Sequence, residues 1–217
     1  MSRQKLSPSP WVFDPGTWPP EDCVAAGADL EPGTIVEAYR RGAFPMPHDG
    51  LLLWWSPMRR GVLEASGMHV SRSLARSRRR FTVTIDQSFE EVIDACADPT
   101  RPGAWIDGPI REAYVRLHRL GWAHSVETRD DEGLLVGGLY GLSIGRLFAG
   151  ESMFHRVTDA SKVALASLSE VVGDDGLIDT QWRTEHLASL GVEEWTRDRY
   201  LAAIGGLVEA EPPAIWA

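Results

Sequence analysis

The stretch Gly137-Gly-Leu-Tyr-Gly-Leu-Ser-Ile-Gly-Arg-Leu-Phe-Ala-Gly-Glu-Ser-Met-Phe154 decides the fold. Its two apolar runs are separated by Gly145, a pattern that predicts a hairpin of two strands. A buried helix is expected from Thr158 onward, followed by a short third strand that ends in Asp179-Thr-Gln181. The glycines of the hairpin allow another backbone or a ligand to approach closely. Polar side chains stand at the strand ends, so we expect a cleft at the mouth of a small sheet.

The composition indicates a substantial apolar core. With 217 residues, 43% of them apolar, the chain forms one large domain or two small ones. No run of about 18 apolar residues is present, and the N-terminus lacks the apolar region of a secretory signal, so we expect no membrane span and no export. Cys23 and Cys96 stand apart in the sequence. Their isolation favours a reducing, cytoplasmic compartment over a disulfide framework or a zinc site.

The charge of the chain is unevenly distributed. A net charge of -9 argues against general binding of nucleic acids. Between Arg59 and Ile85, however, Glu64 is the only acidic residue, and the arginines of this segment are Arg59, Arg60, Arg72, Arg76, Arg78, Arg79 and Arg80. An acidic protein with one arginine block suggests local docking of a polyanion. The alternative interpretation is a solvated helix end.

Helical and extended patterns alternate along the rest of the chain. Residues 1–31 are rich in proline, glycine and tryptophan and predict irregular structure, and the next helix is expected to have Thr34 as its cap. Ser71 is expected to cap another helix. The order of elements predicts an α+β fold around one mixed sheet. We expect a small N-terminal unit, residues 1–65, that packs against a larger unit, residues 66–217.

Several recognised catalytic motifs are absent from the sequence. There is no G-x-x-x-x-G-K-[ST] loop and no G-x-G-x-x-G that opens a helix, so ATP and dinucleotide chemistry are not expected. No H-E-x-x-H and no Cys/His cluster is present, so we expect no catalytic metal. Gly150-Glu-Ser-Met-Phe154 lacks the second glycine of a nucleophile elbow, which argues against Ser152 as a nucleophile.

Three polar residues remain as candidates for chemistry. Glu151 stands at a strand end beside a glycine, where it is either a polar anchor for a substrate or a surface carboxylate. Asp179 and Gln181 are two residues apart on an extended segment, so their side chains are expected on the same side. That spacing suits a carboxylate that orients an amide, or two groups that grip an amine. The alternative is a strand end with solvated polar residues.

A series of short strings, in one order along the chain, resembles the leucyl/phenylalanyl-tRNA–protein transferases of bacteria. The resemblance covers roughly residues 25–200. The strings are Gly42-Ala-Phe-Pro45, Leu53-Trp-Trp-Ser-Pro57, His69-Val-Ser-Arg-Ser73, Gly121-Trp-Ala-His-Ser-Val-Glu127, Leu135-Val-Gly-Gly-Leu-Tyr-Gly141, Gly150-Glu-Ser-Met-Phe154, Ala160-Ser-Lys162, Asp179-Thr-Gln181 and His186-Leu-Ala-Ser-Leu-Gly191. No single string would be decisive, but their number and order are specific.

The resemblance implies a fold, a reaction and its partners. The fold is a small N-terminal domain with a larger mixed-sheet domain similar to the N-acetyltransferases (GNAT-like). The reaction moves leucine, phenylalanine or methionine from an aminoacyl-tRNA to the α-amine of a protein that begins with Arg or Lys. In the family this marks the protein for degradation through the N-degron pathway. An aminoacyl ester is already activated, so the resemblance implies no cofactor and no metal.

The resemblance also implies roles for particular residues. The polar residues of the family's active site correspond to Asp179, Gln181 and Glu151, and a tryptophan near the terminal adenosine corresponds to Trp105. The apolar pocket for the aminoacyl side chain corresponds to Leu139, Phe148, Met153 and Ile178. The basic helix that binds the tRNA acceptor stem corresponds to Arg72, Arg76, Arg78, Arg79 and Arg80.

The sequence departs from the family's pattern at two positions, and two other functions compete with the one implied. Met46 stands where some members have a tryptophan at the adenosine contact, and Thr180 stands where another has a cysteine, which argues against a thiol role.

An acetyl-CoA-dependent N-acetyltransferase would need a glycine-rich pyrophosphate loop at a helix start, and none is present. A non-enzymatic tRNA-binding module would explain the arginines but not the three polar residues.

Overall fold

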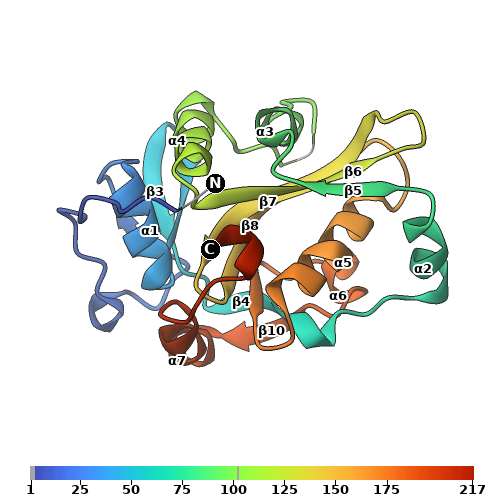
Figure 1. Cartoon of the computed structure of the whole chain (residues 1–217). Helices are drawn as coiled ribbons and strands as arrows, with labels where there is room; N and C mark the ends of the chain where they lie inside the picture. The colour runs from blue at the N-terminus through green and yellow to red at the C-terminus, as the bar shows by residue number, and fades with distance from the viewer. Residues whose placement is uncertain (1–2, 102) are drawn as a thin grey trace.

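The computed structural model describes residues 3–101 and 103–217 and contains two β-sheets (Figure 1). The smaller sheet has three antiparallel strands in the order β1 (Cys23–Ala26), β3 (Leu51–Trp55) and β2 (Phe44–His48). Helix α1 (Pro32–Arg40) packs against β2. Figure 1 shows this N-terminal unit in blue at one side of the molecule. A short turn of 3₁₀ helix, η1 (Pro15–Thr17), precedes β1.

The larger sheet has seven strands and is mixed. Its strands follow the order β10-β4-β9-β8-β7-β6-β5. All neighbouring pairs are antiparallel except β8 and β9, which are parallel and are joined by helix α5 (Ala160–Val172). The α+β class, with a small N-terminal unit and a larger mixed sheet, is therefore confirmed. The strands are β4 (Arg59–Glu64), β5 (Thr82–Ile85), β6 (Ala123–Arg129), β7 (Leu135–Ile144), β8 (Leu147–His155), β9 (Leu177–Gln181) and β10 (Glu193–Thr196).

Helices cover both faces of the larger sheet (Figure 1). Helices α3 (Phe89–Cys96) and α4 (Gly108–Arg119) pack on one face, and α5 packs on the other. Successive residues of a strand face opposite sides, so Tyr140 joins the core beneath α3 and α4, while Leu139 joins the core beneath α5. The remaining helical elements are α2 (Arg72–Arg78), α6 (Glu185–Ala188), α7 (Arg197–Leu207), η2 (Ala65–Gly67) and η3 (Ala214–Trp216).

The predicted hairpin, helix and third strand are present as β7, β8, α5 and β9. The prediction that hairpin glycines permit close approach is confirmed at Gly137. A Cβ atom there would lie 2.5 Å from the Cβ of Ala160, at the start of α5, and 3.0 Å from its carbonyl carbon. Any other residue at 137 would therefore push α5 away from the sheet.

Two local predictions about the N-terminal unit were wrong, and one helix cap was right. Helix α1 begins at Pro32 with Glu31 before it, so Thr34 lies inside the helix and is not its cap. Proline suits the first helical turn because its missing N–H would have no partner there. Cys23–Ala26 is a strand, although residues 1–31 were expected to be irregular; residues 1 and 2 lie outside the described part. Ser71 does cap α2, because its hydroxyl accepts the N–H of Leu74.

The division into units 1–65 and 66–217 remains a prediction. Strand β4, Arg59–Glu64, lies inside the larger sheet between β10 and β9. The last residues assigned to the N-terminal unit therefore contribute an interior strand to the larger sheet, which brings Arg60 into the sheet that carries the site.

Candidate functional site

A cleft opens where the two parallel strands of the larger sheet separate. β8 and β9 are paired only from Leu147 to Ala149 and from Leu177 to Asp179. Beyond that point a cavity of about 120 Å³ lies between them. Its wall is mostly aliphatic, with a few polar groups, as in many sites for small ligands. The lining residues are Leu139, Gly150, Glu151, Ser152, Met153, Leu165, Leu168, Ile178, Thr180, Gln181 and Leu187.

A β-bulge at the cleft re-aims the side chains of β8. Tyr140 is opposite Ser152 and Gly141 is opposite Gly150, so Glu151 is an extra residue without a partner on β7. Only glycine fits at 141, because a Cβ atom would lie 2.1 Å from the carbonyl oxygen of Ala149. Glu151 faces the same side as Ala149, toward α1 and α4, and the extra residue shifts the alternation beyond it, so that Met153 lies on the α5 side.

Glu151 is buried against two tyrosines from separate helices. Tyr39 Oη of α1 lies 2.5 Å from Oε1 and Tyr114 Oη of α4 lies 2.9 Å from Oε2. The two phenolic oxygens are 2.7 Å apart. Burial raises the pKa of Glu151 to about 8, although both hydroxyls act in the opposite direction. Burial, reinforced by the carboxyl group, also raises the pKa of both tyrosines.

Asp179 occupies a different environment, in a fully buried ion pair with Arg60. Arg60 Nε and Nη2 lie 2.8 and 2.5 Å from its two carboxylate oxygens, a two-pronged contact. The hydroxyl of Tyr200 donates to Oδ2 at 2.8 Å, and the backbone N–H of Gln181 donates to Oδ1 at 2.9 Å. Burial is the largest single influence on the pKa of Arg60 and lowers it, but the charge and hydrogen bonds of Asp179, together with Tyr200 and Tyr39, raise the pKa overall. Both oxygen atoms of the Asp179 carboxylate are therefore held by hydrogen bonds within the protein.

Gln181 ends β9 and is one of the residues that line the cavity. Its backbone has φ +57°, the left-handed region that non-glycine residues seldom adopt. The hydrogen bond from its N–H to Asp179 holds the residue in that conformation. Its Nε2 is buried and has no hydrogen-bond partner among the described residues. A strained residue with an unused buried donor, beside a cavity, suits a group that meets a ligand.

The structure brings together most, but not all, of the candidates from the sequence. Leu139, Met153 and Ile178 line the cavity, and so do Glu151 and Gln181. Phe148 does not line it: the side chain is buried in the α5 core, with its ring centroid 5.4 Å from that of Trp216. Trp105 also lies outside the lining, half-buried against the core beneath α3 and α4.

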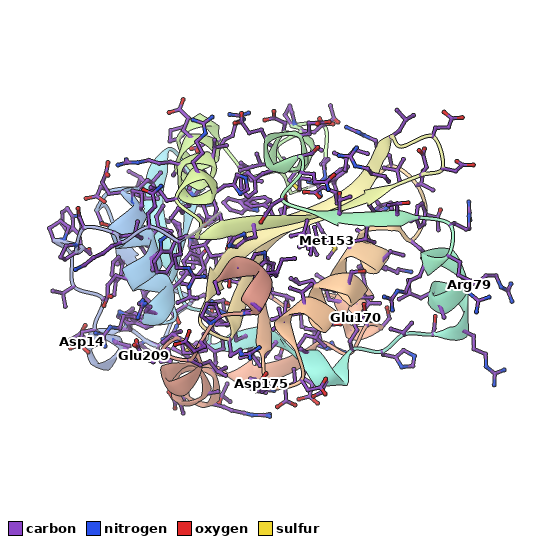
Figure 2. The ribbon with its side chains drawn as sticks, in the orientation of Figure 1. Asp14, Arg79, Met153, Glu170, Asp175 and Glu209 are labelled. Carbon is purple, nitrogen blue, oxygen red and sulfur yellow. The ribbon has the colours of Figure 1, made fainter. Side chains whose placement is uncertain are left out.

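The arginine block lies on α2 and the turn that follows it, at one end of the molecule. Figure 2 shows Arg79 projecting outward there, while Met153 lies nearer the middle. Arg78 is bonded to Glu170 of α5 at 2.7 Å, and Ser77 donates to Asp159 at 2.8 Å, which ties α2 to α5. Across the part of the chain described, no carboxylate lies within 4.0 Å of the exposed members of the block, Arg72, Arg76, Arg79 and Arg80.

Sequence analysis missed four residues that surround the site. Arg60 belongs to the arginine-rich segment by composition, yet it is fully buried and serves Asp179. Tyr39, Tyr114 and Tyr200 were not selected from the sequence, although their hydroxyls contact the two carboxyl groups. Within its short strand, Arg-Arg-Gly-Val-Leu-Glu, only the apolar Val62 and Leu63 nearby could have signalled that Arg60 is buried. Its partner lies 119 residues away in the sequence.

Neither a metal site nor a membrane-spanning helix is found among residues 3–101 and 103–217, which the structure describes. No group of three or more His, Cys, Asp or Glu side chains is arranged to hold a metal ion. No helix has both the length and the apolar character that crossing a membrane requires.

Comparison with known proteins identifies close relatives of the chain. The family model described as leucyl/phenylalanyl-tRNA protein transferase matches residues 62–205, and the model of that enzyme's N-terminal domain matches residues 28–58. The protein named leucyl/phenylalanyl-tRNA–protein transferase in Azoarcus sp. (strain BH72) is 47% identical to this chain, and the alignment covers 96% of this chain and 95% of that protein. The protein of the same name in Aromatoleum aromaticum is 49% identical, and the alignment covers 91% of this chain and 86% of that protein. The solved structure of L-PGS from Bacillus licheniformis aligns with 70% of this chain and 54% of its own, at 13% identity and a TM-score of 0.39, too low to bear on function.

Proposed function

Because the chain belongs to the leucyl/phenylalanyl-tRNA–protein transferases, which transfer amino acids from tRNA to proteins, we propose that its cleft binds the side chain of the amino acid in transit. One observation carries this proposal: an aliphatic cavity of about 120 Å³ has the polar residues Glu151 and Gln181 among those that line it. An aminoacyl ester needs such a combination, because its side chain is buried while its carbonyl and the incoming amine need polar partners.

The lining of the cavity favours unbranched or γ-branched apolar side chains. Leucine, phenylalanine and methionine offer apolar surface without a charge to desolvate. Met153 is flexible and polarizable, so the cavity can adjust between these three shapes. Isoleucine and valine branch at Cβ, next to the ester, where the cavity is expected to be narrow.

Catalysis is mostly positioning. The α-amine of the acceptor protein attacks the ester carbonyl, and a free α-amine titrates near pH 8, so a useful neutral fraction exists at cellular pH. The side-chain carbonyl of Gln181 accepts a hydrogen bond from the amine and orients its lone pair. Asp179 acts behind Gln181, since its carboxylate holds the Gln181 N–H and is itself held by Arg60. Glu151 orients the amine or the terminal ribose.

The tRNA binds through the arginines of α2. Arg72, Arg76, Arg79 and Arg80 are exposed and available to phosphates, while Arg78 first has to leave Glu170. Local binding of this kind is compatible with a chain of net charge -9. The half-buried Trp105 is the proposed neighbour of the terminal adenosine.

The acceptors are proteins that begin with Arg or Lys, and the modification marks them for degradation in the cytoplasm. A transfer assay tests the function directly. Labelled leucyl-tRNA is incubated with a peptide that begins with Arg and with a matched peptide that begins with Gly. Label is expected on the first peptide alone, and added coenzyme A or EDTA should change nothing. Absence of transfer to the Arg peptide, or equal transfer to both, would contradict the proposal.

A further inference from the structure

The oxygen atoms around Glu151 form a closed ring of short contacts. The ring runs from Oε1 of Glu151 to Tyr39 Oη at 2.5 Å, from there to Tyr114 Oη at 2.7 Å, and back to Oε2 at 2.9 Å. Two of these distances are normal for O–H···O hydrogen bonds, and the contact between Glu151 and Tyr39 is shorter than usual. The three residues come from α1, α4 and β8, so the ring joins the N-terminal unit to the larger sheet.

Counting hydrogens decides the charge of the carboxyl group. Three contacts need three hydrogens, and the two phenols supply two, which they retain because their pKa values are raised. If Glu151 were ionised, the ring would hold two hydrogens for its three contacts. At one contact two oxygen atoms would then face each other with no hydrogen between them, in a buried site. A carboxyl O–H supplies the missing hydrogen: the carboxyl group donates to one phenol, that phenol donates to the other, and the second phenol donates to the other carboxyl oxygen.

We propose that Glu151 is protonated at neutral pH and closes this ring as a neutral positioning residue. The other groups that face it agree with this state. Asp179 of β9 is negative and opposes a second charge, whereas Arg60 of β4 is positive but is bonded directly to Asp179. Tyr140 of β7 is buried and neutral.

The consequence, which rests on the proposed function, concerns the proton released during transfer. A carboxyl group that already carries its proton cannot take one from the attacking amine at neutral pH. Glu151 is therefore excluded as the general base in that range. The ribose hydroxyl beside the ester is then proposed to take the proton of the amine and to pass its own proton to the ribose oxygen that leaves as the ester bond breaks and the amide bond forms, with Gln181 orienting the amine.

Infrared difference spectroscopy of the free protein tests the protonation state without using activity. At neutral pH the wild-type protein should show the carbonyl band of a protonated carboxyl group. The band should shift when glutamate side chains carry ¹³C, be missing in Glu151→Gln, and vanish as the pH rises through about 8. If Glu151→Gln fails to fold, the labelled wild-type protein alone decides. No band at neutral pH, or a band that persists in Glu151→Gln, would overturn the proposal.

Unfolding measurements provide a second test. The pKa is raised from 4.5 to about 8 in the folded state, so the stability that the neutral group contributes is complete below 4.5 and is lost as the pH rises through 8. The free energy of unfolding of the wild type should therefore fall, relative to Glu151→Gln, across that range. A constant difference would contradict a protonated Glu151. A protein that shows the band but does not transfer leucine would contradict the proposed function and leave the ring intact.

Discussion

The cleft and the arginine surface of α2 are built from opposite kinds of contact. Behind the cleft, Asp179 and Arg60 are fully buried and each bonds several fixed neighbours. In the turn that follows α2, Arg79 and Arg80 are exposed and have no carboxylate neighbour in the described parts of the chain. Buried, satisfied groups hold a geometry, while exposed charges attract a polyanion at long range. Chemistry and tRNA binding should therefore respond to different mutations.

The largest effect is expected in the cleft, at Gln181. Replacing it with alanine should lower turnover by about 10²- to 10⁴-fold, the range for a positioned proton-transfer group. The affinity for tRNA, measured in parallel, should stay near that of the wild type because the arginines of α2 are untouched. Near-normal turnover would mean that Gln181 is not needed to orient the amine, and that the ribose hydroxyl of the substrate acts without it.

Arg60 should show what the buried pair contributes to stability. Arg60→Ala leaves the Asp179 carboxylate buried without its partner, which should cost about 3–5 kcal/mol of unfolding free energy. The adjacent Arg59 is a matched control, because it pairs with Glu194 at 2.8 Å on the surface. Arg59→Ala should cost about 0–1 kcal/mol. Similar losses in the two variants, in denaturant titrations, would mean that burial does not distinguish these arginines.

Binding of tRNA should depend on α2 through its salt sensitivity. Replacing Arg78, Arg79 and Arg80 with alanine should reduce the slope of log affinity against log salt by about 2–3, since each phosphate contact contributes about 0.9. Arg41→Ala, an exposed change in the N-terminal unit, is the control and should leave the slope unchanged. An unchanged slope in the triple variant would mean that these arginines only solvate a helix end.

The smallest effect concerns the choice of amino acid. Leucine should be transferred in preference to isoleucine by about 10- to 200-fold, the range that apolar pockets reach. Met153→Ala should weaken this preference because Met153 lines the cavity. Phe148→Ala should instead lower stability by about 3–5 kcal/mol, because its side chain is in the core. Equal transfer of the two amino acids by the wild type would contradict a shaped cavity.

The sequence predicted the parts of this molecule that depend on local pattern. The hairpin around Gly145, helix α5 and strand β9 follow from apolar spacing and glycine, and the Ser71 cap follows from side-chain chemistry. Strand β1 was missed because its partner, β3, lies more than 25 residues away and supplies the pairing that its own sequence does not indicate.

The same limit applies to the site. Gln181, Asp179 and Glu151 were selected by their place at strand ends, which is a local property. The residues that bond these carboxyl groups could not be selected in the same way, because they are distant in the sequence. Arg60 is 119 residues from Asp179, and Tyr39 is 112 residues from Glu151. The bulge at Glu151 also depends on the register with β7, which no pattern within β8 reveals.

The division of labour between the cleft and α2 is tested most directly by measuring single-turnover transfer from leucyl-tRNA over a range of tRNA concentrations. Gln181→Ala should keep the concentration for half-maximal rate and lose maximal rate by about 10²- to 10⁴-fold. The triple alanine variant of Arg78, Arg79 and Arg80 should do the reverse, with a weaker, less salt-dependent affinity and a maximal rate that saturating tRNA restores. A triple variant that stays slow at saturating tRNA, or a Gln181 variant that loses affinity instead of rate, would contradict the account.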